Sequence, residues 1–387
     1  MPNFFTTRNL IIAVAALLLA GGGLVWYLTL PKGAGEERKS AAEFFYGLFP
    51  GGGESQLTEE EQKRLEEAER EGILPPETPA QRGESFQLVP EAVSGATIVK
   101  GRVRYIEKSS GHVFEMDFDG GNKQRISNTT IPGIFEVVWS GTGGRAILKY
   151  LSGEKLNILS ANFTGSSTQG SFLSPDIKDA LFSLKGDRIA YVIEAPDETL
   201  VITAAPDNKN QTVRLRTPHS SWKILWPEDN NLYLLTSPSA YLDGFLYKIN
   251  LASGNFTKTL GPKPGLLASL NGANWFISEA DTDNKTVISS LAIKTLPEKC
   301  AWSKKSKDVI LCGVPLSLPA GIYPDDWYKG KISFDDVIIK MNLSGGSASS
   351  VLIPENADVI NPVLSEDETL LFFINKKDGT LWRVKLE

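Results

Sequence analysis

The sequence predicts an all-β fold, a seven-bladed β-propeller, with a six-bladed ring as the alternative. A motif of an apolar or aromatic residue, a serine, a polar turn and an apolar run returns about every 40–45 residues, the period of a propeller blade. Runs downstream of Phe86 alternate apolar and polar positions, the period of a half-buried strand. Turn signals such as Asp119-Gly120 and Asp378-Gly379 separate these runs.

Copies of this motif mark the inner strand of each expected blade. The clear copies are Val138-Trp139-Ser140, Leu181-Phe182-Ser183 and Ala301-Trp302-Ser303, and a weaker one is Val363-Leu364-Ser365. On this count the blades begin near Ala92, Ile134, Ile177, Trp222, Leu266, Lys299 and Val359. The fifth blade is weak and lies close to the sixth, which keeps the six-bladed alternative open.

The propeller domain is expected to span 86–387 and to close on itself. The last blade has three apolar runs and then lacks an outer strand. Phe86–Val89 lies just upstream of the first blade and has no other assignment. Because an open ring would expose unpaired strand edges, we expect this segment to complete the last blade and to bring both ends of the domain together.

The N-terminal region predicts a membrane anchor. Leu10–Leu30 holds 21 residues without a charge, long enough to cross a bilayer as a helix, with Trp26 and Tyr27 near one end. A cleaved signal peptide is the alternative. Basic residues on the two flanks do not settle the orientation. We expect residues 1–9 as a cytoplasmic tail, a single-pass helix in the lipid bilayer of the cell membrane, and the propeller on the extracytoplasmic side.

Residues 31–85 are interpreted as a linker that holds the propeller away from the bilayer. Within it, 57–71 predicts a short charged helix, because Thr58 and Glu61 have the spacing of a capping box. Its few apolar residues, such as Leu65, are too sparse for a coiled-coil seam, so a solvated helix is expected.

The chain has two cysteines, Cys300 and Cys312, on either side of the turn at Lys304–Lys307. If the flanking runs form a hairpin, the two cysteines face each other on neighbouring strands. A disulfide would then fit and would indicate an oxidising compartment. Two buried free thiols are the alternative.

Two stretches resemble the repeats of TolB-type propellers and related WD-like propellers. One is His112–Ser127, HVFEMDFDGGNKQRIS, and the other is Phe182–Val192, FSLKGDRIAYV, in which Leu184 and Lys185 replace the usual Pro and Asp. The resemblance implies an envelope protein that acts through contacts with other proteins. It carries over no catalytic residue.

Charge and motifs exclude several classes of function. A net charge of −6 and a pI near 5.3 argue against a nucleic-acid partner. The only histidines, His112 and His219, fit no zinc motif, and no cofactor or metal is expected. Asp281–Asn284 begins like a calcium loop but lacks its glycine and distal glutamate.

The most unusual stretch is Pro315–Phe334, which interrupts the sixth blade. It holds the candidate binding residues Tyr323, Asp325, Asp326, Trp327 and Tyr328. Aromatic residues beside charges are favoured at recognition surfaces. The alternative is a loop that folds its aromatic residues back over the blade.

These observations favour a membrane-tethered protein-interaction or scaffold module of the cell envelope, with an unknown envelope protein or peptide as its partner. The alternative is a propeller enzyme or sensor that binds a glycan or small ligand in the central funnel. Such an enzyme needs converging carboxylates, for which Asp117, Asp176, Glu194 and Asp325 are candidates.

Overall fold

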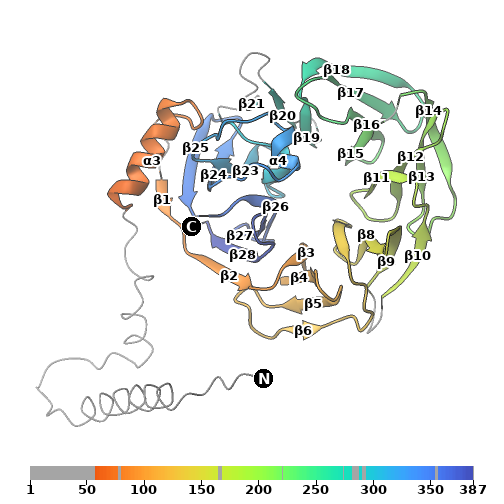
Figure 1. Cartoon of the computed structure of the whole chain (residues 1–387), viewed down its shortest axis with the longest axis horizontal. Coiled ribbons are helices and arrows are strands. Elements are labelled where there is room, and N and C mark those ends of the chain that lie inside the picture. The colour runs from red at the N-terminus through yellow and green to blue at the C-terminus, as the bar shows by residue number, and fades with distance from the viewer. Residues whose placement is uncertain are drawn as a thin grey trace, which may run out of the picture. The chain divides into compact units, whose positions relative to one another are not determined.

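Seven sheets stand around a central axis in the described part of the chain (Figure 1). The structure is a computed structural model that describes residues 57–76, 80–163, 168–219, 221–272, 274–280, 287–289, 293–353 and 356–386. All of them belong to one unit, Ser55–Glu387. The protein is therefore an all-β propeller, as the repeating motif predicted.

The first four sheets each hold four strands in chain order from the axis outward. Sheet one has β3 (Val93–Val99), β4 (Arg102–Glu107), β5 (Val113–Met116) and β6 (Gln124–Arg125). Sheet two has β7 (Ile134–Trp139), β8 (Arg145–Ser152), β9 (Lys155–Asn162) and β10 (Gln169–Leu173). Sheet three has β11 (Ile177–Phe182), β12 (Ile189–Glu194), β13 (Thr199–Ala204) and β14 (Thr212–Thr217). Sheet four has β15 (Trp222–Glu228), β16 (Asn231–Thr236), β17 (Asp243–Asn250) and β18 (Phe256–Pro264).

The last three sheets depart from this pattern. Sheet five has three described strands, β19 (Leu267–Asn271), β20 (Asn274–Ala280) and β21 (Val287–Ser289). Sheet six follows the 3-10 turn η1 (Pro297–Lys299) and has β22 (Cys300–Trp302), β23 (Val309–Pro315), β24 (Asp336–Asn342), β25 (Ser347–Leu352) and β1 (Ala80–Arg82). Sheet seven has β26 (Val359–Leu364), β27 (Leu370–Asn375), β28 (Leu381–Lys385) and β2 (Ser85–Val89).

Strand β2 completes the last sheet from upstream of the first one. It pairs antiparallel with β28, with Phe86 opposite Arg383, and the amide of Lys385 donates to the carbonyl of Glu84 over 2.8 Å. This is the segment that the sequence assigned to closure. The pairing covers the edge that β28 would otherwise expose.

The serine of the repeating motif caps the turn that follows the inner strands β7, β11 and β26. The hydroxyls of Ser140 and Ser183 each accept the amide five residues on, over 3.2 Å, and Ser365 accepts the amide of Leu370 over 3.0 Å. All three serines are buried. A local hydrogen bond therefore explains why the motif recurs, because it fixes the turn between the first two strands.

The hydrophobic core lies between neighbouring sheets. One cluster joins Ile147 and Ile158 of sheet two to Ile177, Ile189 and Ile202 of sheet three. Equivalent clusters join other neighbouring sheets, so apolar side chains fill the space between them.

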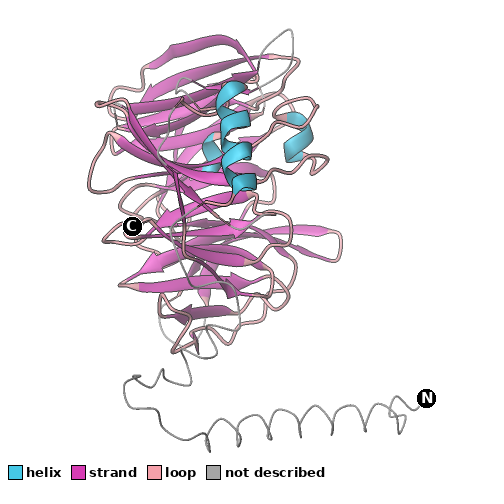
Figure 2. Ribbon diagram, turned by 90° about the vertical axis from the view of Figure 1, so that its left-hand side faces the viewer, coloured by secondary structure: helices cyan, strands magenta, loops and turns pink. Residues whose placement is uncertain are grey.

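The helix α3 (Glu59–Arg70) corrects the linker interpretation. It begins at the predicted N-cap, because the hydroxyl of Thr58 accepts the amide of Glu61 and the Glu61 side chain accepts the amide of Thr58. It is not a solvated spacer, however: Leu65 and Ala68 are buried against sheets five and six. The helix lies on the outer side of the sheets (Figure 2).

The segment after α3 is held to the ring as well. Ile73 and Leu74 are buried in the same cluster, and the carbonyl of Ile73 accepts the amide of Lys294 over 3.1 Å. β1 then adds a parallel strand to β25. Residues 57–76 and β1 are thus packed on the propeller, because a narrow stripe of apolar side chains is enough to bury one helix face.

The two cysteines face each other on neighbouring strands, as the predicted hairpin requires. Cys300 lies opposite Cys312 on β22 and β23, with 4.0 Å between the Cα atoms, and they form a disulfide.

None of the helices in the described ranges has both the length and the hydrophobicity of a membrane span. The predicted anchor Leu10–Leu30 and the tail at 1–9 lie outside the described residues.

Candidate interaction face and its buried anchor

The insertion Pro315–Phe334 connects β23 to β24 and contains the short helix α4 (Asp325–Tyr328). The loop 237–242 makes the same connection in sheet four, between β16 and β17. Because strand order is the same in both sheets, both connections leave from one face of the ring. They touch there: the carboxylate of Asp325 accepts the amide of Ala240 over 2.8 Å.

The structure divides the five candidate binding residues of the insertion. Tyr323 and Trp327 are 1% and 3% exposed, so these two rings are not part of the exposed surface, as the alternative of a loop folded back over the blade expects. They pack with Phe334, Leu267 and Leu296 in one cluster. The insertion folds back because burying these rings removes a large apolar area from water.

The two acidic candidates shape the insertion locally. The carboxylate of Asp326 accepts the amide of Ile322 over 3.0 Å and lies 3.1 Å from the ammonium of Lys331. These contacts, the amide first, lower the pKa of Asp326. Asp325 reaches sheet four as described above. Both carboxylates therefore serve the conformation of the insertion.

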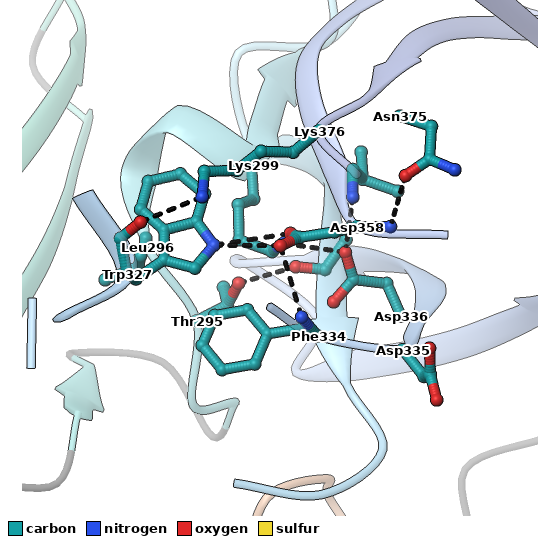
Figure 3. A network of polar contacts seen from close by, with 12 residues as sticks. Thr295, Leu296, Lys299, Trp327, Phe334, Asp335, Asp336, Asp358, Asn375 and Lys376 are labelled. Atoms are coloured by element: carbon teal, nitrogen blue, oxygen red, sulfur yellow. Dashed lines mark hydrogen bonds and ion pairs between the residues drawn. The ribbon is translucent and has the colours of Figure 1, made fainter. Parts of the chain in front are cut away.

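Beneath the insertion lies a fully buried ion network (Figure 3). The Lys299 ammonium lies 2.5 Å from a carboxylate oxygen of Asp358 and 2.7 Å from one of Asp336. The side chains of all three have no exposed surface. Lys299 comes from η1, Asp336 begins β24 and Asp358 precedes β26, so the network joins sheets six and seven.

The insertion is tied to this network through its aromatic residues. The indole N–H of Trp327 and the amide of Phe334 both donate to Oδ2 of Asp358, each over 3.1 Å. The Lys299 ammonium lies 4.9 Å from the Phe334 ring centroid and 5.5 Å from that of Trp327. Lys376 adds a hydrogen bond to the Trp327 carbonyl over 2.8 Å.

Burial shifts the pKa of two groups at this site, Asp336 and Lys376. Loss of solvent raises the pKa of Asp336 to about 6, which Lys299 opposes and Asp358 reinforces. Its Oδ2 accepts the amide of Val359 over 2.6 Å, whereas its buried Oδ1 has no hydrogen-bond partner among the described residues. Burial likewise lowers the pKa of Lys376. The network thus anchors the insertion through three charged side chains that have no exposed surface.

Sequence reasoning did not single out Lys299, Asp336 or Asp358. A weak signal was present, because each charged residue directly precedes a mainly apolar run: CAW, VIIKM or VINPVL. Only the fold shows that these three positions converge, since 59 residues separate Lys299 from Asp358.

Three large aromatic or aliphatic side chains stay exposed on this face. Tyr241 and Leu242, in the loop tied to α4, are 61% and 68% exposed. Tyr328 on α4 is 38% exposed, its hydroxyl donates to Glu298, and the Lys223 ammonium lies 5.3 Å from its ring centroid. We call Tyr241, Leu242 and Tyr328 the apolar rim.

The carboxylates considered for an enzyme each have a polar contact close by. Asp117 pairs with Arg102 over 2.5 Å in sheet one. Asp176 accepts the hydroxyl of Ser174 over 3.1 Å, between sheets two and three. Glu194 accepts the amide of Ser221 over 2.6 Å, at the end of β12. Asp117 therefore lies in another sheet from Glu194, whereas the pairing of Ile177 with Ile193 sets Asp176 beside Glu194 at one end of sheet three.

The histidines also have local contacts. The Nε2 of His112 lies 3.0 Å from the hydroxyl of Thr130, and the His219 ring packs edge-on to Trp222. In the described ranges, no group of three His, Cys, Asp or Glu side chains has a geometry that could hold a metal ion. The weak calcium-loop match at Asp281–Asn284 lies outside those ranges.

Comparison with known proteins identifies the fold. No family model matches the sequence, and no curated protein matches it either. The β-propeller domain of Cps50 (Swd1) from Myceliophteria thermophila is similar with a TM-score of 0.51 at 10% identity, covering 78% of this chain and 100% of that one. The β-propeller domain of the Trilobed protease from Pyrococcus furiosus has a TM-score of 0.51 at 9% identity, covering 77% and 95%.

TolB from Acinetobacter baumannii is among the similar structures, with a TM-score of 0.40 at 9% identity, covering 74% of this chain and 64% of that one. Likenesses at these identities show the fold and nothing of the activity. The chain has the β-propeller fold of the Cps50 (Swd1) and Trilobed protease domains.

Proposed function

We propose that this chain is a membrane-tethered, extracytoplasmic β-propeller that acts as a protein-interaction or scaffold module of the cell envelope. We count the three-stranded sheet five as a full blade, which gives a seven-bladed ring. The observation that carries the proposal is the apolar rim, where large side chains stay exposed beside a firmly anchored insertion. Exposed aromatic and aliphatic side chains on a rigid support are typical of protein contact sites.

Two further observations support the location. The disulfide between Cys300 and Cys312 is typical of an oxidising compartment. The uncharged stretch Leu10–Leu30 has the length of a bilayer-spanning helix. Fractionation of cells that produce the full chain tests the tether. The full chain should resist alkaline extraction from membranes, and a version lacking 10–30 should be released.

The interaction is tested by affinity capture from solubilised membranes followed by mass spectrometry. We expect a Tyr241→Ser, Leu242→Ser variant to lose a specific protein that the unaltered chain retains. Phe172→Ser is the matched control, because Phe172 is 66% exposed on β10, the outer strand of sheet two. Equal retention by both variants would contradict the assignment of the contact to the apolar rim.

The alternative of a ligand in the central funnel makes a different prediction. A glycan or small ligand would shift the melting temperature of the unaltered chain and of the rim variant alike. A shift of that kind, together with unchanged protein capture, would favour the sensor or enzyme over the scaffold.

A further inference from the structure

The Lys299 network has the arrangement needed for a covalent reaction between its own side chains. A lysine amine lies against a carboxyl group, at 2.5 Å from Nζ to Oδ1 of Asp358, and a second carboxyl group, that of Asp336, touches the same amine at 2.7 Å. Holding an amine and a carboxyl group together replaces a collision between separate molecules, which greatly raises the rate of condensation. Complete burial excludes the water that would favour hydrolysis.

We propose that Lys299 and Asp358 condense into an isopeptide bond, with Asp336 as the group that moves the protons. The reaction joins Nζ of Lys299 to Cγ of Asp358 and releases one water. The bond would link η1 of sheet six covalently to the start of β26 in sheet seven.

The atoms and protons balance without any other reactant. The Lys299 ammonium first gives a proton to the Asp358 carboxylate, leaving a neutral amine beside a neutral acid. The amine attacks Cγ of Asp358 and forms a tetrahedral intermediate. Asp336 accepts a proton from the attacking nitrogen and delivers one to the departing hydroxyl, which leaves as water, and Asp336 returns to its starting state.

The surroundings favour each part of this path. Trp327 and the Phe334 amide both donate to Oδ2 of Asp358, where negative charge develops in the intermediate. The unpartnered Oδ1 of Asp336 leaves that carboxyl group able to hold a proton, in agreement with its raised pKa. Condensation also removes one buried cation and one buried anion, and buried charges are costly to keep.

Intact mass measurement tests the bond. The full chain, purified in detergent, is unfolded and its disulfide reduced before the measurement. We expect the mass to be lower than that of the sequence by one water. Tryptic digestion should yield a branched product that joins 295–304 to 341–376, uncut at Lys299. A mass equal to that of the sequence would overturn the proposal, as would a branch at any other pair of residues.

Variants assign the roles. Lys299→Arg keeps the positive charge but removes the amine, so the variant should have the full mass of its sequence. Asp336→Asn keeps both bonded residues, so the bond should form slowly or be lost while circular dichroism stays that of a β fold. If Asp336→Asn folds and loses water as fast as the unaltered chain, Asp336 has no part in the reaction.

Discussion

The turns after the inner strands and the insertion between β23 and β24 are both connections of one ring, yet they are held by different means. The turns after β7, β11 and β26 each depend on one serine and an amide five residues away, as at Ser140 and Ser365. The insertion depends on Asp358, Lys299 and Lys376, which belong to other parts of the ring. Connections held locally can be found in a sequence, whereas connections held at long range must be found in the fold.

The largest effect is expected at the insertion. Trp327→Ala would leave a cavity and the buried Asp358 carboxylate with one donor fewer, and should lower the free energy of unfolding by about 3–5 kcal/mol. Urea denaturation measures it. Leu242→Ala, on the exposed rim, serves as the control and should change stability by less than about 0.5 kcal/mol. If Trp327→Ala and Leu242→Ala lower the free energy of unfolding by similar small amounts, the insertion is not anchored through its aromatic residues.

The second effect extends the comparison to α3. Leu65→Ala removes a side chain buried against sheets five and six, and should cost about 2 kcal/mol in urea denaturation. Glu66→Ala changes the exposed neighbour and should have almost no effect. If both variants unfold like the unaltered chain, α3 does not contribute to the stability of the ring.

A smaller loss is expected at the locally held turns. Ser365→Ala removes the acceptor for the amide of Leu370 in a buried position and should cost about 1 kcal/mol, the usual value for one capping hydrogen bond. Ser349→Ala, on the exposed surface of β25, is the comparison. A loss at Ser365 as large as that for Trp327→Ala would remove the contrast between the two kinds of connection.

The smallest effect on stability is expected at the turn after β22, which is held by a glutamate of the next sheet. Glu368 accepts the hydroxyl of Ser303 over 2.7 Å and the amides of Lys304 and Lys305. Burial alone would raise its pKa, but these hydrogen bonds outweigh burial and lower it. A lowered carboxyl pKa contributes stability that is present above the ordinary glutamate pKa and is lost as pH falls through the folded-state value.

Thermal melts of the unaltered chain and Glu368→Gln, measured between about pH 7 and about pH 3, test this linkage. The variant should lose less stability on acidification than the unaltered chain. If the melting temperatures of the two proteins fall by the same amount on acidification, the contacts of Glu368 do not contribute to the pH dependence of stability.

Prediction from sequence reached the features that local patterns encode. Alternating runs and serine-containing turns predicted the strands. The spacing of Thr58 and Glu61 predicted the start of α3. The unassigned run at Phe86 predicted the strand that pairs with β28. The first two predictions depend on residues close together in the chain. The third depends on Phe86–Val89 having no place in any other blade.

Among the candidate site residues, the sequence located the insertion but not its orientation. Exposed and buried aromatic residues look alike in a sequence, and Trp327 is buried while Tyr328 beside it is exposed. The burial of α3 was not predicted for a similar reason. The sequence shows its narrow apolar stripe but not the surface of sheets five and six on which that stripe is buried.

The amino-acid sequence by itself determined a ring of β sheets, because the period of the strands and the hydrogen bonds of the turns are short-range properties. Only the tertiary structure decided which side of α3 is buried, where the insertion lies, and that Lys299, Asp336 and Asp358 share one dry site. The physical reason is that the energy of a buried charge or ring depends on what surrounds it in space, and those neighbours come from segments far apart in the chain.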